Sequence, residues 1–282
     1  MNSNDFLKKF KIKFLKFWRN EDSKVSILRD IFIALVFVLI ILIALWTYTG
    51  QWFGAPMVAI ESGSMMHEDE PFGRYGTIDA GDMVFLVNIN EKDDIVTFID
   101  KDPDNFYYGK YGDVIIYKPY GKDDKEQIIH RAMCWVEYNE NYKTYTVEGY
   151  GVFNETSITI PSLGLDEWVI PKRDPYGKKI TPHSGFLTKG DNQRTNDKCD
   201  QVGGICVEPI KAEWITGKAR GELPWIGTLN LLFNDILGGK NTVGNVPSDS
   251  IICLIIFIAI LISIPVILDF YSYYREKKKQ QF

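Results

Sequence analysis

Two long apolar stretches frame the chain. The first runs from residue 31 to 46 without a polar side chain and continues as a Thr-Tyr-Thr fringe, and the second covers 251–268 with only Ser263 and Pro265 interrupting it. At about 1.5 Å per residue, such a stretch spans roughly 27 Å, close to the hydrocarbon core of a bilayer. The pattern predicts transmembrane helices over 31–49 and 251–268, the second kinked but not ended by its proline.

Between these stretches, short runs rich in β-branched and aromatic residues predict strands. The predicted strands lie in 81–88, 112–119, 126–136, 142–148, 186–189 and at the end of 205–218. Residues 89–111 and 150–183 are rich in Asp, Asn, Gly, Pro and Tyr, which predicts loops. We therefore expect a mostly β domain over 50–222, with a large insert at 136–182.

An apolar segment and a linker, residues 223–250, connect this domain to the second apolar stretch. Residues 223–237 carry one Trp and few charges. This composition fits a helix that lies in the plane of the membrane interface, and it fits an ordinary core helix equally well.

Charge is distributed unevenly and predicts a topology. Residues 1–30 hold eight Lys and Arg against four Asp and Glu, and residues 269–282 hold four against two. The part between, 47–250, has 20 basic and 31 acidic residues, a net charge of −11. Because basic flanks stay in the cytoplasm, we expect two cytoplasmic tails and an extracytoplasmic domain on a cell membrane protein with two spans. Alternatively, the first stretch is a cleaved signal peptide or the second a buried core helix.

Composition and motifs narrow the function classes. With 45% hydrophobic residues and four cysteines, the chain is neither disordered nor a disulfide-dense scaffold. The net charge of −5 argues against a nucleic-acid partner, since phosphate binding requires clustered Lys and Arg. The sequence has neither metal-ligand spacing nor a glycine-rich phosphate loop, so we expect no metal and no cofactor.

Three segments supply the parts of a nucleophile, a base and a carboxylate. Residues 61–66, ESGSMM, place Ser64 among small residues, His130 lies in the apolar run IIHRA, and TKGDNQRTND carries Asp191 and Asp197. Serine, histidine and aspartate form the set that activates a hydroxyl for acyl transfer. Taken singly, a strand histidine also fits a packed core position, and an Asp-Asn loop an ordinary turn.

The order SGSM, GDMVFL, GDVIIYK, IIHR and TKGDN, with an aspartate six residues on, resembles the type I signal peptidases. It is similar to the archaeal and endoplasmic-reticulum branch, which uses a histidine where the bacterial branch uses a lysine. The resemblance covers about 60–220 in patches. It implies a β-rich serine endopeptidase, tethered at the lipid bilayer, that removes signal peptides from exported preproteins; it leaves open whether accessory subunits take part.

The resemblance also implies roles for individual residues. Ser64 matches the nucleophile and His130 the general base, while Asp197 and Asp191 match the two supporting aspartates. Ser62 matches a position whose hydroxyl contributes to the oxyanion hole. A serine hydroxyl needs a base to take its proton, and a histidine with a pKa near neutrality can do so.

The chain departs from the family at residue 67, where a histidine replaces the usual proline and becomes a second candidate base. The acidic run that follows it at 68–70 lengthens the loop. Two alternatives remain open: a serine–lysine peptidase using Lys118 or Lys125, and a non-catalytic scaffold on a peptidase-like fold.

Two further features depend on the compartment. Cys199 and Cys206 lie close enough in sequence to form a local disulfide, if their Cα atoms approach. Asn154 opens a glycosylation sequon within the insert.

Overall fold

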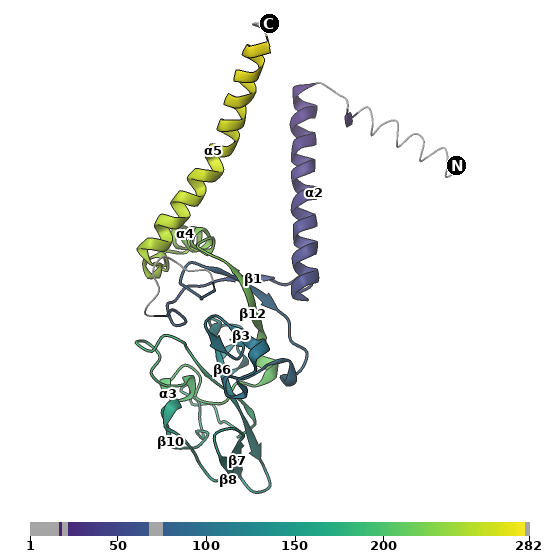
Figure 1. Ribbon diagram of the computed structural model, residues 1–282. Helices are drawn as coiled ribbons and strands as arrows, with labels where there is room; N and C mark the ends of the chain where they lie inside the picture. Colours follow the sequence, from purple (N-terminus) through teal and green to yellow (C-terminus); the bar gives the residue numbers. More distant parts are fainter. Residues whose placement is uncertain (1–16, 19–21, 68–75, 280–282) are drawn as a thin grey trace, which may run out of the picture. The chain divides into compact units, whose positions relative to one another are not determined.

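The computed structural model describes residues 17–18, 22–67 and 76–279 (Figure 1). It divides into two compact units, Met1–Gly54 and Ala55–Phe282. The described part of the first unit is mainly helix α2, and the second unit contains the strands. The strands are β1 Met57–Ala59, β2 Met83–Val87, β3 Phe106–Tyr107, β4 Lys110–Tyr111, β5 Val114–Tyr117, β6 Ile128–Asn139, β7 Thr144–Val147, β8 Val152–Glu155, β9 Ile158–Ile160, β10 Leu165–Trp168, β11 Gly185–Lys189 and β12 Ile215–Leu223.

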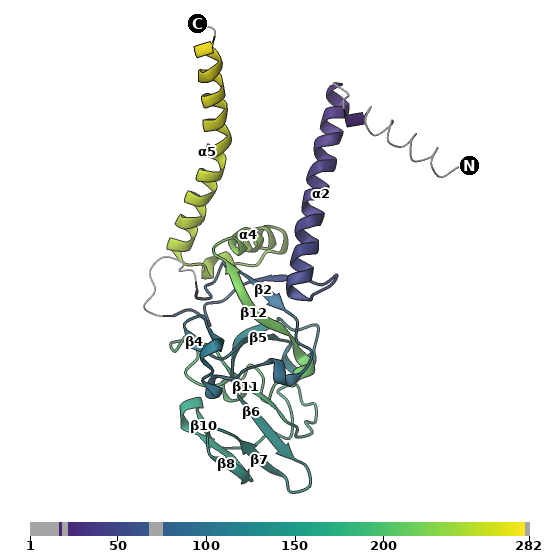
Figure 2. The ribbon, with the colours of Figure 1, turned by 45° about the vertical axis from the view of Figure 1, so that its right-hand side comes forward.

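The second unit is built on one antiparallel sheet. Its strand order is β1-β2-β12-β5-β6-β7-β8, and β11 pairs with β6 outside this path (Figure 2). The prediction of a mostly β domain is confirmed, and each of the six predicted segments contains a strand. β5 lies between β12 and β6 and is buried throughout, which explains its continuous run of apolar residues.

The insert is more ordered than its composition predicts. Residues 150–183 were expected to form a loop, but they contain β8, β9 and β10. These strands are only three or four residues long, too short for an alternating pattern to stand out against the surrounding polar residues. Their buried side chains share a core with β6 and β11; its members include Val136, Val147, Ile158, Leu165 and Leu187.

Residues 89–111 likewise contain more than a loop. They form three short 3-10 turns, Lys92–Asp94, Phe98–Asp100 and Pro103–Asn105, followed by the small β3–β4 hairpin. The prediction of a loop over 89–111 is therefore only partly right: the elements in this range are two or three residues long.

Both apolar stretches form helices long and apolar enough to cross a membrane. α2 spans Ser23–Thr49 and begins before the predicted residue 31, because the Asp22 carboxylate accepts hydrogen bonds from the backbone N–H groups of Lys24 and Val25. α5 spans Ser248–Lys279, continues through Pro265, and runs on into the predicted tail. Most large apolar side chains of both helices are exposed, as a lipid-facing surface requires.

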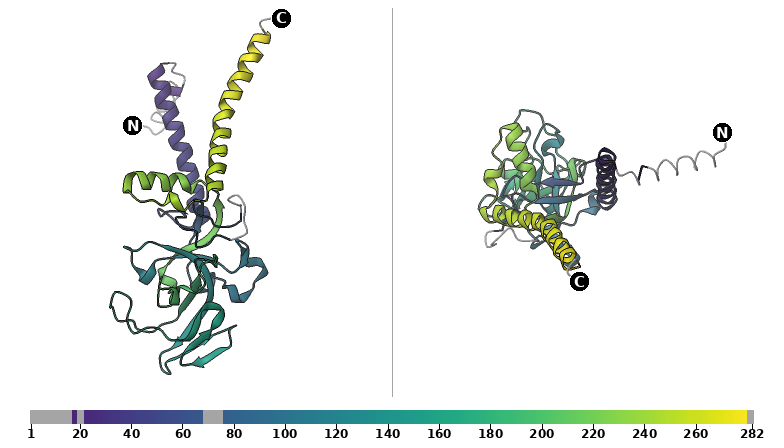
Figure 3. Two further views of the ribbon diagram at one scale, coloured as in Figure 1. Left: turned by 90° about the vertical axis from the view of Figure 1, so that its left-hand side faces the viewer. Right: turned by 90° about the horizontal axis from the view of Figure 1, so that it is seen from above.

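A shorter helix, α4 at Gly227–Gly238, separates β12 from α5 and packs against β1. Figure 3 shows it at the end of the second unit opposite the β7–β8 hairpin. Leu231 is buried, whereas Phe233, Ile236 and Leu237 are exposed. A core helix would bury such residues, so α4 has the exposed apolar face of the interfacial alternative.

Candidate active site

Ser64 lies in a tight turn after β1. The Met66 N–H donates to the Gly63 carbonyl at 3.2 Å, and the Met65 side chain, 1% exposed, anchors the turn in the core. Ser64 itself is half-buried. The Ser62 hydroxyl donates to the Ser64 hydroxyl at 3.4 Å, which places the expected oxyanion-hole residue beside the expected nucleophile.

His130 lies on β6 and contacts a carboxylate that the motif comparison did not select. Its Nδ1 is 2.8 Å from both carboxylate oxygens of Asp200. The His130 side chain is 2% exposed and the Asp200 side chain is fully buried. A carboxylate accepts hydrogen bonds, so this contact suits the neutral imidazole tautomer in which Nδ1 donates and Nε2 carries the lone pair. This is the tautomer that a general base requires.

The expectation that Asp197 supports the base is not met. Asp197 is exposed, and its described contact is through its backbone carbonyl, which accepts from the Lys189 Nζ at 2.8 Å. Two further residues lead from Asp197 to α3, Asp200–Gly203, where the chain turns back and packs against β11. That return brings the first residue of α3 to His130. The sequence offers Asp197 and Asp200 close together, and no local pattern distinguishes them.

Asp191 is buried, but it pairs with Arg131 instead of His130. The Arg131 Nη2 donates to it at 2.6 Å and the Arg131 Nε at 3.0 Å, and the Arg131 side chain is fully buried. Burial alone would raise the pKa of Asp191. Hydrogen bonds from His67 and Arg131, and the charges of Arg131 and Lys110, hold that pKa well below its usual value. Asp191 is therefore a charged structural anchor.

The loop held by Asp191 supports the turn that carries Ser64. The Asn192 N–H donates to the Ser64 carbonyl at 2.9 Å, and its side-chain amide donates to the Gly63 carbonyl at 2.7 Å. A Cβ at Gly190 would lie 2.6 Å from the Ser64 carbonyl oxygen, so only glycine permits this approach. The GDN segment thus positions the backbone of Ser64.

Ser64 and His130 line the same cavity, which measures about 490 Å³. Within the described part of the chain, the side-chain hydrogen-bond partner of the Ser64 hydroxyl is Ser62. The proton transfer from Ser64 to His130 that the sequence leads us to expect would take place across this cavity. The lining is mixed, with Ser62, Ser64, His130 and Asn196 among apolar side chains. The remaining lining residues are Val58, Ala59, Ile60, Glu61, Ile116, Glu126, Gln127, Ile128, Ile129 and Ile205.

Two strand segments border this cavity, and each of them pairs with another described strand along one edge only. β1 is at the end of the sheet and pairs with β2 alone. The pairing of β11 with β6 ends at Lys189 and Arg131, so Ile128–His130 pair only with β5. Free backbone edges of this kind bind extended peptides by strand addition.

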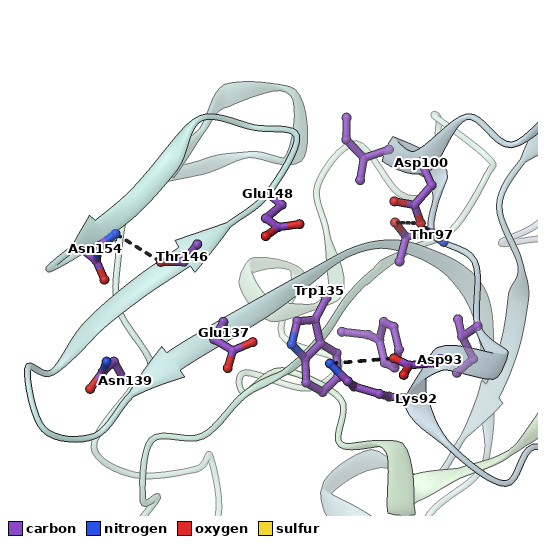
Figure 4. Close-up of a pocket in the computed structure, with 13 residues that line it drawn as sticks. Lys92, Asp93, Thr97, Asp100, Trp135, Glu137, Asn139, Thr146, Glu148 and Asn154 are labelled. Atoms are coloured by element: carbon purple, nitrogen blue, oxygen red, sulfur yellow. Dashed lines mark hydrogen bonds and ion pairs between the residues drawn. The ribbon is translucent and has the colours of Figure 1, made fainter.

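A second cavity, of about 430 Å³, lies over the β6–β7–β8 hairpins (Figure 4). Glu137 and Glu148 project from the sheet, and the Lys92 ammonium lies 5.0 Å from the centre of the Trp135 ring. Its lining includes neither serine nor histidine. It therefore lacks the pairing of a serine with a histidine that the first cavity has.

The alternative bases are engaged elsewhere. The His67 Nε2 lies 3.4 Å from Asp191, and the Lys118 Nζ lies 2.6 Å from Asp123. A hydrogen bond with Tyr176 raises the pKa of Lys125, whereas a lysine base requires a lowered one. None of these three residues lines the cavity of Ser64 and His130.

The cysteines considered for a disulfide are free thiols. Cys199 and Cys206 are both buried, and burial raises their pKa values to about 11 and about 12. Across residues 17–18, 22–67 and 76–279, no three His, Cys, Asp or Glu side chains group so as to hold a metal ion. Asn154, the sequon residue, is exposed at the rim of the second cavity. The acidic residues 68–70 lie outside the described residues.

No protein-family model and no curated protein sequence matches the chain.

Proposed function

We propose that this chain is a membrane-bound serine endopeptidase that removes N-terminal signal peptides from exported preproteins. The observation that carries the proposal is the buried pair of His130 and Asp200, at 2.8 Å, on the wall of the cavity that Ser64 also lines. The order of motifs from SGSM to TKGDN supplies the substrate class.

The chemistry follows from the protonation of the pair. His130 Nε2 takes the Ser64 proton as the hydroxyl oxygen attacks the scissile carbonyl, and Asp200 stabilises the imidazolium that forms. The proton then passes to the leaving amine, and water repeats the cycle on the acyl-enzyme. The backbone N–H of Ser64 and the Ser62 hydroxyl are the proposed donors to the oxyanion, each worth about 3 kcal/mol.

The cavity suits an extended peptide. A substrate strand between β1 and the start of β6 would form main-chain hydrogen bonds with both edges. Ala59, Ile116 and Ile129 give the walls an apolar character. We expect selection for small side chains at the cleavage site to act through pocket volume, since a side chain larger than the available space is rejected sterically.

The helices support placement at a membrane. α2 and α5 supply two spans by length and composition, and the exposed face of α4 adds an apolar surface beside β1. A signal peptide is itself an apolar segment in the bilayer, so its cleavage site emerges at the membrane surface. With both basic tails in the cytoplasm, the proposed topology puts the cavity on the extracytoplasmic side.

The proposal is tested with membranes that contain the full-length chain and a preprotein whose conversion to the mature form is followed with time. We expect Ser64→Ala and His130→Ala each to lower the rate at least about a thousandfold at equal expression. His183→Ala is the matched control, because that ring pairs with Glu208 at 3.0 Å and does not line the cavity.

The outcomes separate the alternatives. Cleavage at the wild-type rate by Ser64→Ala would overturn the proposal and favour the scaffold. Loss in Ser64→Ala with full activity in His130→Ala would assign the base to His67 or to a lysine.

A further inference from the structure

Asp200 receives more hydrogen bonds than the one from His130. The Tyr117 hydroxyl donates to its Oδ2 at 2.7 Å, and the Thr188 hydroxyl donates to the same oxygen at 2.5 Å. Tyr117 and Thr188 are fully buried, and Asp200 is 1% exposed. We call Tyr117 and Thr188 the hydroxyl clamp.

The sheet explains why both hydroxyls reach this carboxylate. His130 pairs with Ile115 on β5, and Tyr117 lies two residues further along that strand, so its side chain projects from the same face. Thr188 enters from β11, where it pairs with Ala132, two residues beyond His130 on β6. Three adjacent strands, visible in Figure 2, thus converge on Asp200.

Both hydroxyl groups of the clamp carry the hydrogen that they need to donate to Asp200. Burial, and then the negative charge of Asp200, raise the pKa of Tyr117 well above its usual value. Its phenol therefore remains a neutral donor over the whole range in which histidine titrates. The threonine hydroxyl is neutral and has one hydrogen to donate, which Thr188 directs to Asp200.

We propose that Tyr117 and Thr188 are positioning residues for catalysis, holding Asp200 in the one orientation in which it fixes the His130 ring. The inference rests on the proposed function, in which His130 is the base. The hydroxyl clamp does not touch the substrate and acts only through Asp200. It would also moderate the charge on Asp200, because two neutral donors compete with the imidazolium for the same carboxylate.

This role predicts a kinetic signature. In Tyr117→Phe, Asp200 loses one donor and holds His130 less firmly, so we expect kcat to fall about tenfold while KM changes less than about twofold. The carboxylate also keeps more charge with which to stabilise the imidazolium. The acid limb of the kcat/KM profile should therefore move to higher pH, by about half a unit.

Other ionisable groups do not account for such a shift. The Cys199 and Cys206 thiols near Asp200 stay neutral, since burial raises their pKa values to about 11 and about 12. Glu61 and Glu126 line the same cavity as His130, but they are the same in wild type and variant. The Arg131–Asp191 pair, from the neighbouring position on β6, is likewise unchanged.

The experiment measures pH–rate profiles for preprotein cleavage by the purified full-length chain in detergent. Tyr117→Phe is compared with Tyr145→Phe, another buried tyrosine, whose hydroxyl accepts from the Ile170 N–H at 3.2 Å in the core of the insert. A tenfold lower kcat and a shifted acid limb in Tyr117→Phe alone would support the clamp. Wild-type values in both variants would overturn it.

A second pair of variants decides the matter if Tyr117→Phe does not fold. Thr188→Ser keeps the hydroxyl and Thr188→Val removes it at similar volume. We expect Thr188→Ser to retain most activity and Thr188→Val to lose about tenfold with the same shift in pH. Equal activity of the two would overturn the clamp.

Failure of the inference is distinguishable from failure of the proposed function. The Ser64→Ala variant is run in the same assay. If it cleaves at the wild-type rate, both the proposed function and the role of the hydroxyl clamp are refuted. If it is inactive while Tyr117→Phe and Thr188→Val match wild type, only the clamp falls.

Discussion

His130 and Arg131 are neighbours on β6, yet each contacts a different aspartate on a different face of the sheet. His130 contacts Asp200 and lines the cavity with Ser64, whereas Arg131 pairs with Asp191, which belongs to the loop that supports Ser64. Successive side chains of a strand point to opposite faces, so one carboxylate cannot serve both residues. The comparison shows two buried contacts in different surroundings. The His130–Asp200 contact lies on the wall of the cavity that Ser64 also lines, whereas the Arg131–Asp191 ion pair holds the loop that bonds to the Ser64 turn.

The largest expected effect separates Asp200 from Asp197. Asp200→Asn removes the acceptor that fixes the His130 tautomer, so we expect kcat to fall at least about a thousandfold with little change in KM. Asp197→Asn, at an exposed position three residues earlier, should stay within about twofold of wild type. Preprotein cleavage by the two purified variants provides the measurement. The reverse ranking would restore Asp197 as the supporting acid and contradict the division between the two pairs.

The second prediction concerns stability. Asp191→Asn leaves the Arg131 guanidinium buried without a counter-charge, so the free energy of unfolding should fall by about 3 kcal/mol. It would be measured by denaturant unfolding of the full-length chain in detergent, with Asp197→Asn as the exposed control.

The pH dependence of this loss has a definite sign. The folded pKa of Asp191 lies below the ordinary value of 3.8 that the carboxyl has in the unfolded chain, so its contribution to stability is complete above that pH and is lost as the pH falls below it. The deficit of Asp191→Asn relative to wild type should therefore be constant near neutrality and shrink in acid. A deficit that is independent of pH would show that the charge of Asp191 does not contribute.

The smallest expected effect concerns Asn192, which connects the loop that contains Asp191 to the turn that carries Ser64. Asn192→Ala removes the 2.7 Å hydrogen bond to the Gly63 carbonyl but leaves the backbone bond to Ser64. We expect kcat/KM to fall about fivefold, the equivalent of about one neutral hydrogen bond. Asn141→Ala, in the exposed β6–β7 turn, is the control. Unchanged kinetics in Asn192→Ala would mean that the GDN segment positions Ser64 through its backbone alone.

Several features were accessible from the sequence because they depend on local pattern. Alternation and β-branched content predict β2, β5, β6, β7, β11 and β12, and length with apolar composition predicts the two long helices. The motif TKGDN singled out Asp191, but the sequence did not show that its partner is Arg131 and not His130. Short strands such as β8 and β9 escaped prediction because three or four residues carry too little periodic signal.

The amino-acid sequence alone specifies the segments and the residue types that each one offers: a serine in a small-residue turn, a histidine in an apolar strand, and a loop with Asp191 and Asp197 that is followed by Asp200. The tertiary structure decided which aspartate meets the histidine. That choice depends on the antiparallel register of β11 with β6, on the alternation of His130 and Arg131 across the sheet, and on the turn into α3 that returns Asp200 to β11. These are long-range constraints, since they join residues up to 70 positions apart, and no local pattern encodes them.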